Sequence, residues 1–251
     1  MKVKKCFFIP ARAGSKGVKN KNILDLNGRM LFEWSVFSAY RSMGNYDRIY
    51  VSTNSKEILK WHKEVIQNHP SEHVRESIFV IERPEHLCED NSSTEAAILD
   101  AINNFLTNGI EIDDIVLLQP TSPFRTDDII NKCIKSYYEN KSRLTVFSAS
   151  KNTPFNWKNK NGVFVPTYDF KERKMRQNLA VDEFNWHEDG SVYVFSSYSI
   201  LSNNNRMTEH AFAIENNTIN SIQIDNYDEM EMAKAISKID KVDLWMKTVM
   251  F

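Results

Sequence analysis

Short apolar runs alternate with segments of helical periodicity over the first 150 residues of the chain. The runs predict strands at residues 3–9, 48–52, 77–81, 115–118 and 144–149. The periodic segments predict helices at residues 31–43, 56–65 and 95–106, and a further helix that starts at Thr126 or Asp127 and ends at Tyr138; Ser55 and Ser93 are candidate N-caps. Because strands that alternate with helices form parallel sheets, the pattern predicts an α/β fold with a doubly wound, mostly parallel sheet.

The pattern changes after residue 150. Residues 151–189 are rich in Asn, Lys and aromatic side chains, and Pro154 and Pro166 interrupt them. We interpret this stretch as an inserted arm or small β subdomain within one domain spanning residues 1–251, because its aromatic content does not suit a disordered linker. Beyond it we predict strands at 191–195 and 218–224 and a helix at 228–238.

Composition limits the functions that the chain can have. A chain of 251 residues with 41% hydrophobic and 26% charged residues can form one large soluble domain. The net charge of -1 does not indicate a nucleic-acid-binding surface. Cys6, Cys88 and Cys133 lack metal-site spacing, and we expect three reduced structural thiols, with Cys6 buried. The apolar start is too short for a signal peptide and no run reaches the length of a membrane span, so we expect a cytosolic protein without a membrane partner.

A cluster of cations follows the first predicted strand. Glycines in this loop would let the backbone approach a ligand, and the cations would neutralise phosphate oxygens. Its position at the carboxyl end of a strand, where α/β sheets bind ligands, favours a phosphate site over a solvated turn. Its spacing fits neither GxxxxGK[ST] nor GxGxxG, which disfavours common kinases, GTPases and dehydrogenases. The cations are Arg12, Lys16, Lys19 and Lys21, and the glycines are Gly14 and Gly17.

Several motifs, in order, resemble the acylneuraminate cytidylyltransferases, also called CMP-sialic acid synthetases. Their order along nearly the whole chain makes the resemblance strong, although each motif alone is weak. The stretch Gln119 to Arg125, with Leu117 and Leu118 before it, is very similar to the family's LLQPTSPLR signature. The other similar segments are Ile9 to Lys16 with Lys21 and Asn22, Val51 to Asn54, Glu82 to Leu87 with Asp90 and Ser92 to Thr94, Met175 to Leu179, and Glu188 to Val194.

The resemblance implies transfer of CMP from CTP to the anomeric hydroxyl of a 2-keto sugar acid, on a GT-A-like nucleotidyltransferase fold. It implies Arg12, Lys21 and Gln119 as catalytic residues, and Gln119, Arg176 and Gln177 as residues that bind the sugar acid. An Arg side chain suits a carboxylate substrate because its donors bind both oxygens. The implied nucleotide-binding residues are Ala11, Arg12, Gly14, Ser15, Lys16, Lys21, Asn22 and Ser93.

Each of these residues also has a structural interpretation. Gln119 could end a strand, Arg176 could form a surface ion pair, and Ser93 could only cap a helix. We favour functional roles for Arg12, Lys21 and Gln119, and also for Arg176; for Ser93 the two interpretations are balanced.

The resemblance implies a divalent cation, Mg²⁺ or Mn²⁺. The family offers two aspartates one residue apart on a late strand, where both could face one metal ion. Here Asp225 matches the second aspartate, and we assign it to the metal. Gln223 stands where the first is expected, and its neutral carboxamide is a poorer ligand for Mg²⁺.

Three functions remain open from the sequence. The first is cytidylyl transfer to sialic, legionaminic, pseudaminic or a similar acid. The second is nucleotidyl transfer to a sugar 1-phosphate with another base. The third is a sugar-nucleotide binding protein with impaired catalysis, which only Gln223 supports. The resemblance also implies a homodimer formed through the inserted arm, which would reach towards the partner's site.

Overall fold

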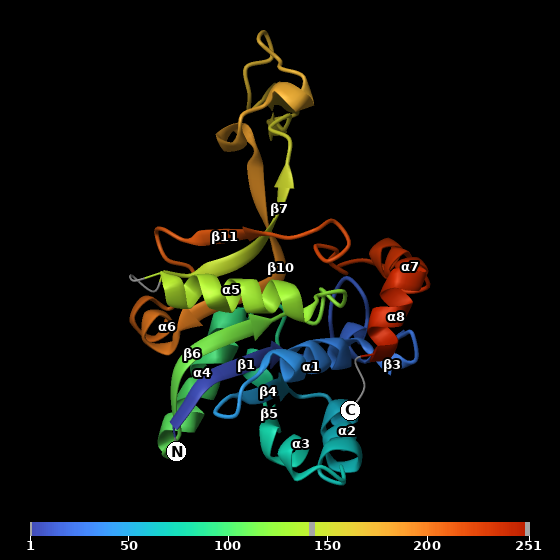
Figure 1. Ribbon diagram of the computed structural model, residues 1–251, viewed down its shortest axis with the longest axis vertical. Coiled ribbons are helices and arrows are strands. Elements are labelled where there is room, and N and C mark those ends of the chain that lie inside the picture. The colour runs from blue at the N-terminus through green and yellow to red at the C-terminus, as the bar shows by residue number, and fades with distance from the viewer. Residues whose placement is uncertain (1, 141–143, 249–251) are drawn as a thin grey trace.

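The computed structural model describes residues 2–140 and 144–248. A seven-stranded sheet in the order β11-β7-β10-β6-β1-β4-β5 forms its centre (Figure 1). The strands of this sheet are β1 (Lys2–Pro10), β4 (Arg48–Thr53), β5 (Ile78–Glu82), β6 (Glu111–Leu118), β7 (Val146–Asn152), β10 (Asn185–Ser196) and β11 (Phe212–Glu215). Two small hairpins are β2 (Asp25–Leu26) with β3 (Arg29–Met30), and β8 (Trp157–Lys160) with β9 (Val163–Pro166).

Helices cover both faces of the sheet. They are α1 (Leu31–Ser42), α2 (Lys56–Trp61), α3 (Glu72–Ser77), α4 (Thr94–Thr107), α5 (Asp127–Glu139), α6 (Ser197–Asn203), α7 (Tyr227–Ile236) and α8 (Asp240–Thr248). A π-helical turn, His62–Ile66, extends α2, so the predicted helix at 56–65 changes its winding midway. Short 3-10 turns lie at Lys21–Ile23, Glu85–Leu87, Arg176–Asn178 and Val181–Glu183.

The strand directions confirm the predicted doubly wound, mostly parallel sheet. β1 pairs in parallel with β4 on one side and with β6 on the other, so Phe7 lies between Ile49 and Val116. β5 continues the parallel half, whereas β10 runs antiparallel to both β6 and β7. Since the chain passes from β1 to β4 on one side and later returns to β6 on the other, the strand order reverses at β1. Ligands bind at the carboxyl edge of such a switch point.

Two apolar clusters occupy the two faces of this sheet. One joins β1, β4 and β6 to helices α1, α2, α3 and α5, and Phe7, Phe32 and Ile130 are fully buried in it. The other joins the opposite face to α4 and α6, through residues such as Phe8 and Phe105. Strands buried on both faces explain why the sequence shows short continuous apolar runs rather than alternation.

A third cluster supports the carboxyl edge of the sheet. Helices α7 and α8 pack there against α1, with Met230 and Met246 both nearly fully buried. Val18 and Ile224 are fully buried in the same cluster, although they belong to segments more than two hundred residues apart in sequence. The cluster therefore holds two loops of the candidate site at fixed positions.

The predicted strand at 218–224 is wrong. Residues 218–221 form a turn and residues 222–225 have no regular structure. The Asn217 side chain accepts a hydrogen bond from the Asn220 amide, at 2.9 Å, and its carbonyl accepts one from Ser221, so the local bonds favour a turn. Ile219, Ile222 and Ile224 pack into the third cluster rather than into a sheet. The strand in this region is instead β11, which precedes the turn.

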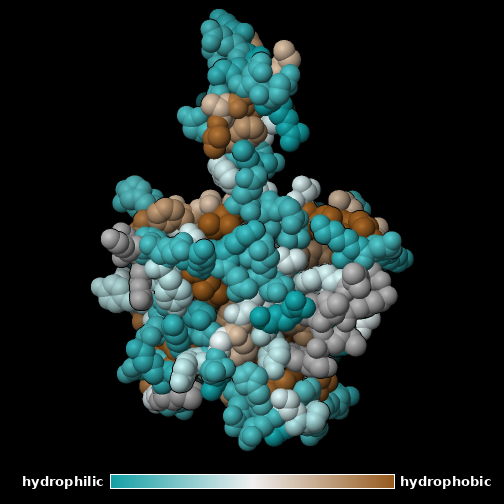
Figure 2. Space-filling view, in the orientation of Figure 1, coloured by the Kyte–Doolittle hydropathy of each residue, from teal (hydrophilic) through white to brown (hydrophobic). Residues whose placement is uncertain are grey.

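Residues between β7 and β10 form a projecting arm (Figure 1). The two strands pair beyond the sheet, with Ser150 opposite His187 and Asn152 opposite Asn185. Phe155 packs edge-on against Tyr168, at 5.2 Å between ring centroids. Figure 2 shows apolar side chains in the lower part of the arm. Many large apolar side chains of the arm are exposed, among them Trp157, Val163, Phe164, Phe170, Met175 and Val181.

Within residues 2–140 and 144–248, no helix combines the length and the hydrophobicity that crossing a bilayer requires.

Candidate active site

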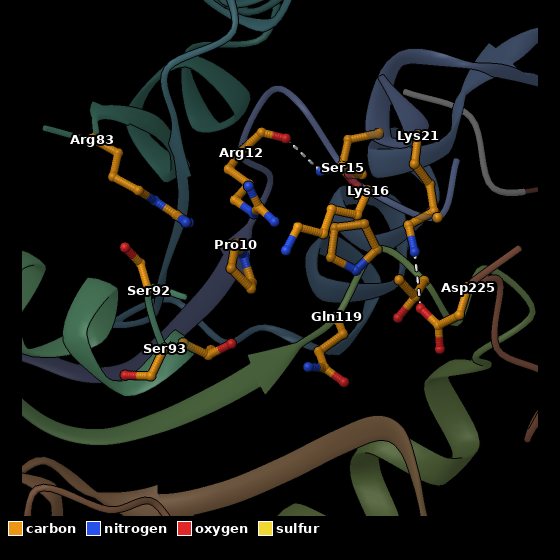
Figure 3. Close-up of a pocket in the computed structure, with 15 residues that line it drawn as sticks. Pro10, Arg12, Ser15, Lys16, Lys21, Arg83, Ser92, Ser93, Gln119 and Asp225 are labelled. Atoms are coloured by element: carbon orange, nitrogen blue, oxygen red, sulfur yellow. Dashed lines mark hydrogen bonds and ion pairs between the residues drawn. The ribbon is translucent and has the colours of Figure 1, made fainter. Parts of the chain in front are cut away.

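A cavity of about 290 Å³ lies at the switch point, beyond the carboxyl ends of β1 and β6 (Figure 3). β1 ends at Pro10, and β6 is followed by Gln119 and then Pro120; after each proline the chain turns into the cavity wall. The lining is polar and carries four positive side chains. It consists of Pro10, Arg12, Ser15, Lys16, Gly17, Lys21, Asn22, Arg83, Ser92, Ser93, Thr94, Gln119, Pro120, Thr121 and Asp225.

Arg12 lies at the rim of the cavity, held by the segment that follows β5. Its guanidinium donates to the Cys88 carbonyl at 2.7 Å and to Asp90 Oδ1 at 3.0 Å. Lys16 approaches the other Asp90 oxygen at 3.4 Å. Hydrogen bonds from Arg12 and then Lys16 hold the pKa of Asp90 below its usual range. Asp90 thus holds both cations at the rim of the cavity, and a phosphate could replace its carboxylate, which is 37% exposed, as their partner.

Lys21 approaches the cavity from the opposite side, and its side chain is 9% exposed. Its ammonium donates to the Ile224 carbonyl at 2.5 Å and to Asp225 Oδ1 at 2.9 Å (Figure 3). An ammonium has three N–H donors, so a third can reach a phosphate oxygen. Lys21 therefore joins the phosphate loop to the Asp225 segment and still presents charge to the cavity.

Gly17 makes the closest approach between these two segments. A Cβ atom added at this position would lie 1.8 Å from the Asp225 carbonyl oxygen. Only glycine permits this backbone contact, because real Cβ atoms do not come so close to backbone oxygens. The glycine therefore has a packing role that spacing alone did not show.

Asn22, Ala11 and Gly14 stabilise the conformation of the phosphate loop, and of the three only Asn22 lines the main cavity. The Asn22 side chain donates to the Arg12 carbonyl at 2.9 Å. Ala11 is fully buried, and its amide donates to the Ser52 carbonyl at 2.9 Å. Gly14 has φ +74 and lies in an outer cavity beside Asn54. Ala11 and Gly14 therefore shape the loop from outside the lining of the main cavity.

Gln119 follows β6 and lines the cavity wall facing the phosphate loop. A fully buried residue, Arg125, holds its backbone from behind. Arg125 donates to the carbonyls of Gln119 and Ser191, each at 2.6 Å, and to Ser35 Oγ at 3.0 Å. Burial lowers the pKa of Arg125 to about 9, so the guanidinium stays charged at neutral pH. Arg125 thus joins β6, β10 and α1 behind Gln119.

Replacing Arg125, which does not itself line the cavity, with Met should destabilise the protein. The Gln119 and Ser191 carbonyls would lose their buried partner, at a cost of about 1–3 kcal/mol each. Chemical denaturation of the two proteins measures the difference. Arg41→Met is the matched control, because the side chains of the Arg41–Asp127 ion pair are 37% and 33% exposed, and surface pairs contribute about 0–1 kcal/mol. Equal stability of the two variants would contradict the assigned role.

Arg83 and Ser92 are among the wall residues for which the sequence predicted no role. Arg83 is 5% exposed, and it donates to Ser52 Oγ and to the Ser52 carbonyl, both at 3.0 Å. Burial lowers the pKa of Arg83. Ser92 lies beside Ser93, which caps α4 by accepting a hydrogen bond from the Ala96 amide at 3.1 Å. The only signal for Arg83 was its place in the segment Glu82 to Leu87, where no role was assigned to it.

The structure does not bring Arg176 and Gln177 to this cavity within one chain. Both lie in a 3-10 turn of the arm and line a separate, wider cavity at the arm's base, together with Lys151, Phe184 and other residues. Their predicted contact with the sugar acid therefore has no counterpart in the geometry of a single protomer.

The donor set for a divalent cation is small. The Asp225 side chain is 63% exposed and lines the cavity, and one of its oxygens faces Lys21. Gln223 and Asp225 do not share a strand face, because residues 222–225 are irregular. In the described part of the chain, no three His, Cys, Asp or Glu side chains converge as metal ligands. One carboxylate fits Mg²⁺ only where phosphate oxygens and water complete the shell.

A cavity at the switch point of an α/β sheet, lined by a loop of cations and one acidic side chain, suits a ligand that carries phosphate groups. The chain belongs to the cytidylyltransferase family, whose profile matches residues 6–243. Its members are nucleotidyltransferases, as the sequence predicted.

Named relatives cover nearly the whole chain. The pseudaminic acid cytidylyltransferase of Campylobacter jejuni is 26% identical over 244 residues, which cover 95% of this chain and 98% of the relative. The CMP-N,N'-diacetyllegionaminic acid synthase of Legionella pneumophila is 25% identical, with 93% and 96% covered. A solved CMP:2-keto-3-deoxy-manno-octonic acid synthetase in complex with CTP has a TM-score of 0.60 at 12% identity, covering 93% of this chain and 98% of that one. This last similarity shows the fold alone.

Proposed function

We propose that this protein transfers CMP from CTP to the anomeric hydroxyl of a 2-keto sugar acid and releases pyrophosphate. The observation that carries the proposal is the cavity at the switch point, where Arg12, Lys21 and Gln119 face one space. Membership of the cytidylyltransferase family supports the base and the reaction class. The names of the two relatives support a sugar acid as acceptor.

In the proposed reaction the anomeric oxygen forms a bond to the α-phosphorus of CTP. The bond between that phosphorus and the bridging oxygen breaks, pyrophosphate leaves, and the hydroxyl proton is released to solvent. Charge accumulates on the phosphate oxygens, so catalysis depends on positioning and neutralisation. Arg12 and Lys16 would exchange Asp90 for the triphosphate, while Lys21 approaches from the other side. Gln119 would lie between nucleotide and acceptor.

A divalent cation, Mg²⁺ or Mn²⁺, would be held by Asp225 together with phosphate oxygens and water. When bound, it would neutralise phosphate charge. Because a CTP-dependent enzyme needs the cytoplasmic nucleotide pool, we propose a cytoplasmic location.

Pyrophosphate release tests the proposed function. The purified protein is assayed with CTP and either pseudaminic, N,N'-diacetyllegionaminic or N-acetylneuraminic acid, in Mg²⁺ or Mn²⁺. We expect turnover with at least one pair, and none when a sugar 1-phosphate replaces the acid or ATP replaces CTP. Tight CTP binding without turnover on any acid would overturn the proposal.

We also propose that the chain is one domain that forms a homodimer through residues 151–189, with Arg176 and Gln177 completing the partner's site. Two observations support this arrangement. The arm exposes large apolar side chains, including Phe164 at 62% and Val181 at 73%. The cavity that Lys21 lines and the turn that carries Arg176 are separate within one chain.

Mixed dimers test whether sites are shared. Lys21→Ala and Arg176→Ala should each lose most activity as pure proteins. After the two are unfolded together and refolded, a mixed dimer has one site with both defects and one with neither, so activity should return. Co-refolding Lys21→Ala with Asp225→Ala is the control, because both residues belong to one site. The absence of recovery in the first mixture would disprove sharing between protomers.

A further inference from the structure

Two carboxamide groups converge on Gly190, at the edge of the cavity. A Cβ atom at Gly190 would lie 2.3 Å from Gln223 Nε2 and 2.6 Å from Gln119 Oε1. The Gln223 atom is a hydrogen-bond donor and the Gln119 atom an acceptor, so two groups of complementary polarity lie next to the same glycine. Because Gly190 has no side chain, Gln119 and Gln223 can both occupy the space beside it.

The backbone at Gly190 is fixed in place. Its φ of +65 favours glycine, and a β-bulge lies between Glu188 and Tyr193. The buried Asp189 beside it accepts hydrogen bonds from Ser148 Oγ, from the Ser191 amide at 2.9 Å, and from the Asn216 side chain at 2.7 Å. Gly190 therefore offers a rigid surface against which the two amides are oriented.

The oxygen and the nitrogen of the Gln119 amide point in different directions. Its oxygen lies at Gly190, next to the Gln223 donor. Figure 3 shows its nitrogen on the side of Ser93. A carboxamide in this orientation presents N–H donors to a ligand, as a carboxylate or hydroxyl acceptor requires. An acidic side chain at 223 would face the Gln119 oxygen with another acceptor and would favour the flipped amide.

We propose that Gln223 is a positioning residue, which holds the Gln119 amide with its nitrogen turned into the cavity, where it can donate to the acceptor sugar acid. Gln223 thus acts on the acceptor through Gln119 rather than as a ligand of the metal. This inference rests on the proposed function. It gives a role to position 223, where the resemblance implied an aspartate and this chain has glutamine.

Gln223→Glu is the sharpest variant, because it keeps the shape and replaces the donor with an acceptor. The Michaelis constant for the sugar acid should rise roughly ten-fold, as expected for loss of one hydrogen bond. The Michaelis constant for CTP and the Mg²⁺ concentration giving half-maximal rate should not change. Gln223→Asn, which keeps the amide, should restore part of the affinity. A metal-ligand role predicts the opposite result, a lower Mg²⁺ requirement with unchanged use of the sugar acid.

A double-mutant cycle separates action through Gln119 from a general structural effect. In a Gln119→Ala background, Gln223→Glu should have little further effect, because the amide that it positions is gone. Additive effects would overturn the inference. If the wild-type protein turns over no acid of the panel, it is the proposed function that fails; if it is active and the effects add, only the role of Gln223 fails. Thermal melting and CTP binding show that each variant is folded.

Gly190→Ala provides an independent test. The added methyl group should displace both amides and raise the Michaelis constant for the sugar acid at least as much as Gln223→Glu. The matched control is Gly109→Ala, since Gly109 has φ +70 and no heavy atom within 4 Å of an added Cβ. The two variants share the backbone strain and differ in the amide contact. Equal effects on sugar-acid use would contradict the role of the amide pair.

Discussion

Gly17→Ala should lower turnover by a hundred-fold or more and weaken CTP binding. The methyl group has no space, because the Asp225 carbonyl oxygen lies 1.8 Å from the position of its carbon atom. The phosphate loop must therefore separate from the Asp225 segment, which moves Lys21 away from its two acceptors. A displacement of about 1 Å in a positioned group can cost on the order of 10²-fold in rate. Steady-state kinetics and calorimetric titration with CTP measure both effects.

Gly44→Ala is the control for this variant. An added Cβ at Gly44 meets only the Asp47 carboxylate, at 3.4 Å, which is ordinary contact. The control should keep near-normal turnover while carrying the same chemical change. If Gly17→Ala were equally active, the close approach would have no part in forming the site.

Lys21→Met should reduce turnover by roughly 10²–10³-fold, the effect of removing one donor that stabilises transition-state charge. Methionine retains most of the apolar stem of the buried lysine and removes its charge. The Ile224 carbonyl and Asp225 lose a partner, so a small loss of thermal stability should accompany the kinetic effect. Single-turnover measurements at saturating CTP separate the chemical step from binding.

Lys19→Met removes an equal charge from the same loop. Lys19 is exposed, and its backbone amide contacts Tyr227 Oη at the outer side of the loop. Its loss should change turnover by less than a few-fold. Similar losses in the two variants would mean that the overall charge of the loop, and not the placement of Lys21, supports catalysis.

The parallel half of the fold could be predicted from sequence because its strands are buried on both faces. Such strands appear as short apolar runs, and polar loops at their carboxyl ends then indicate the binding edge. Residues 218–224 show where this reasoning fails. Ile222 and Ile224 are spaced like residues of a strand, but the loop buries them against helices α7 and α8. The spacing of apolar residues shows that they are buried, but not whether they pack in a sheet or against helices.

The candidate site could be predicted on its nucleotide side and only partly elsewhere. Arg12, Lys16 and Lys21 share one loop, so their proximity follows from the sequence. Arg83 comes from a different strand end, and nothing local separates a buried arginine from an exposed one. The amide pair of Gln119 and Gln223 depends on a backbone turn at Gly190 that no spacing rule indicates.

The third apolar cluster links the phosphate loop to the C-terminal helices energetically. Val18 and Ile224 are buried against α7 and α8, and each lies next to a residue that lines the cavity. A nucleotide that binds only the closed loop stabilises every structure on which that loop depends, by about 2.7 kcal/mol at a ligand concentration one hundred times Kd. Helices α7 and α8 follow the Asp225 segment and form the outer layer of the site. Their backbone amides should therefore exchange with solvent more slowly when CTP is bound. The stability of helices α7 and α8 and the affinity for nucleotide both depend on the same equilibrium between the closed and the opened phosphate loop.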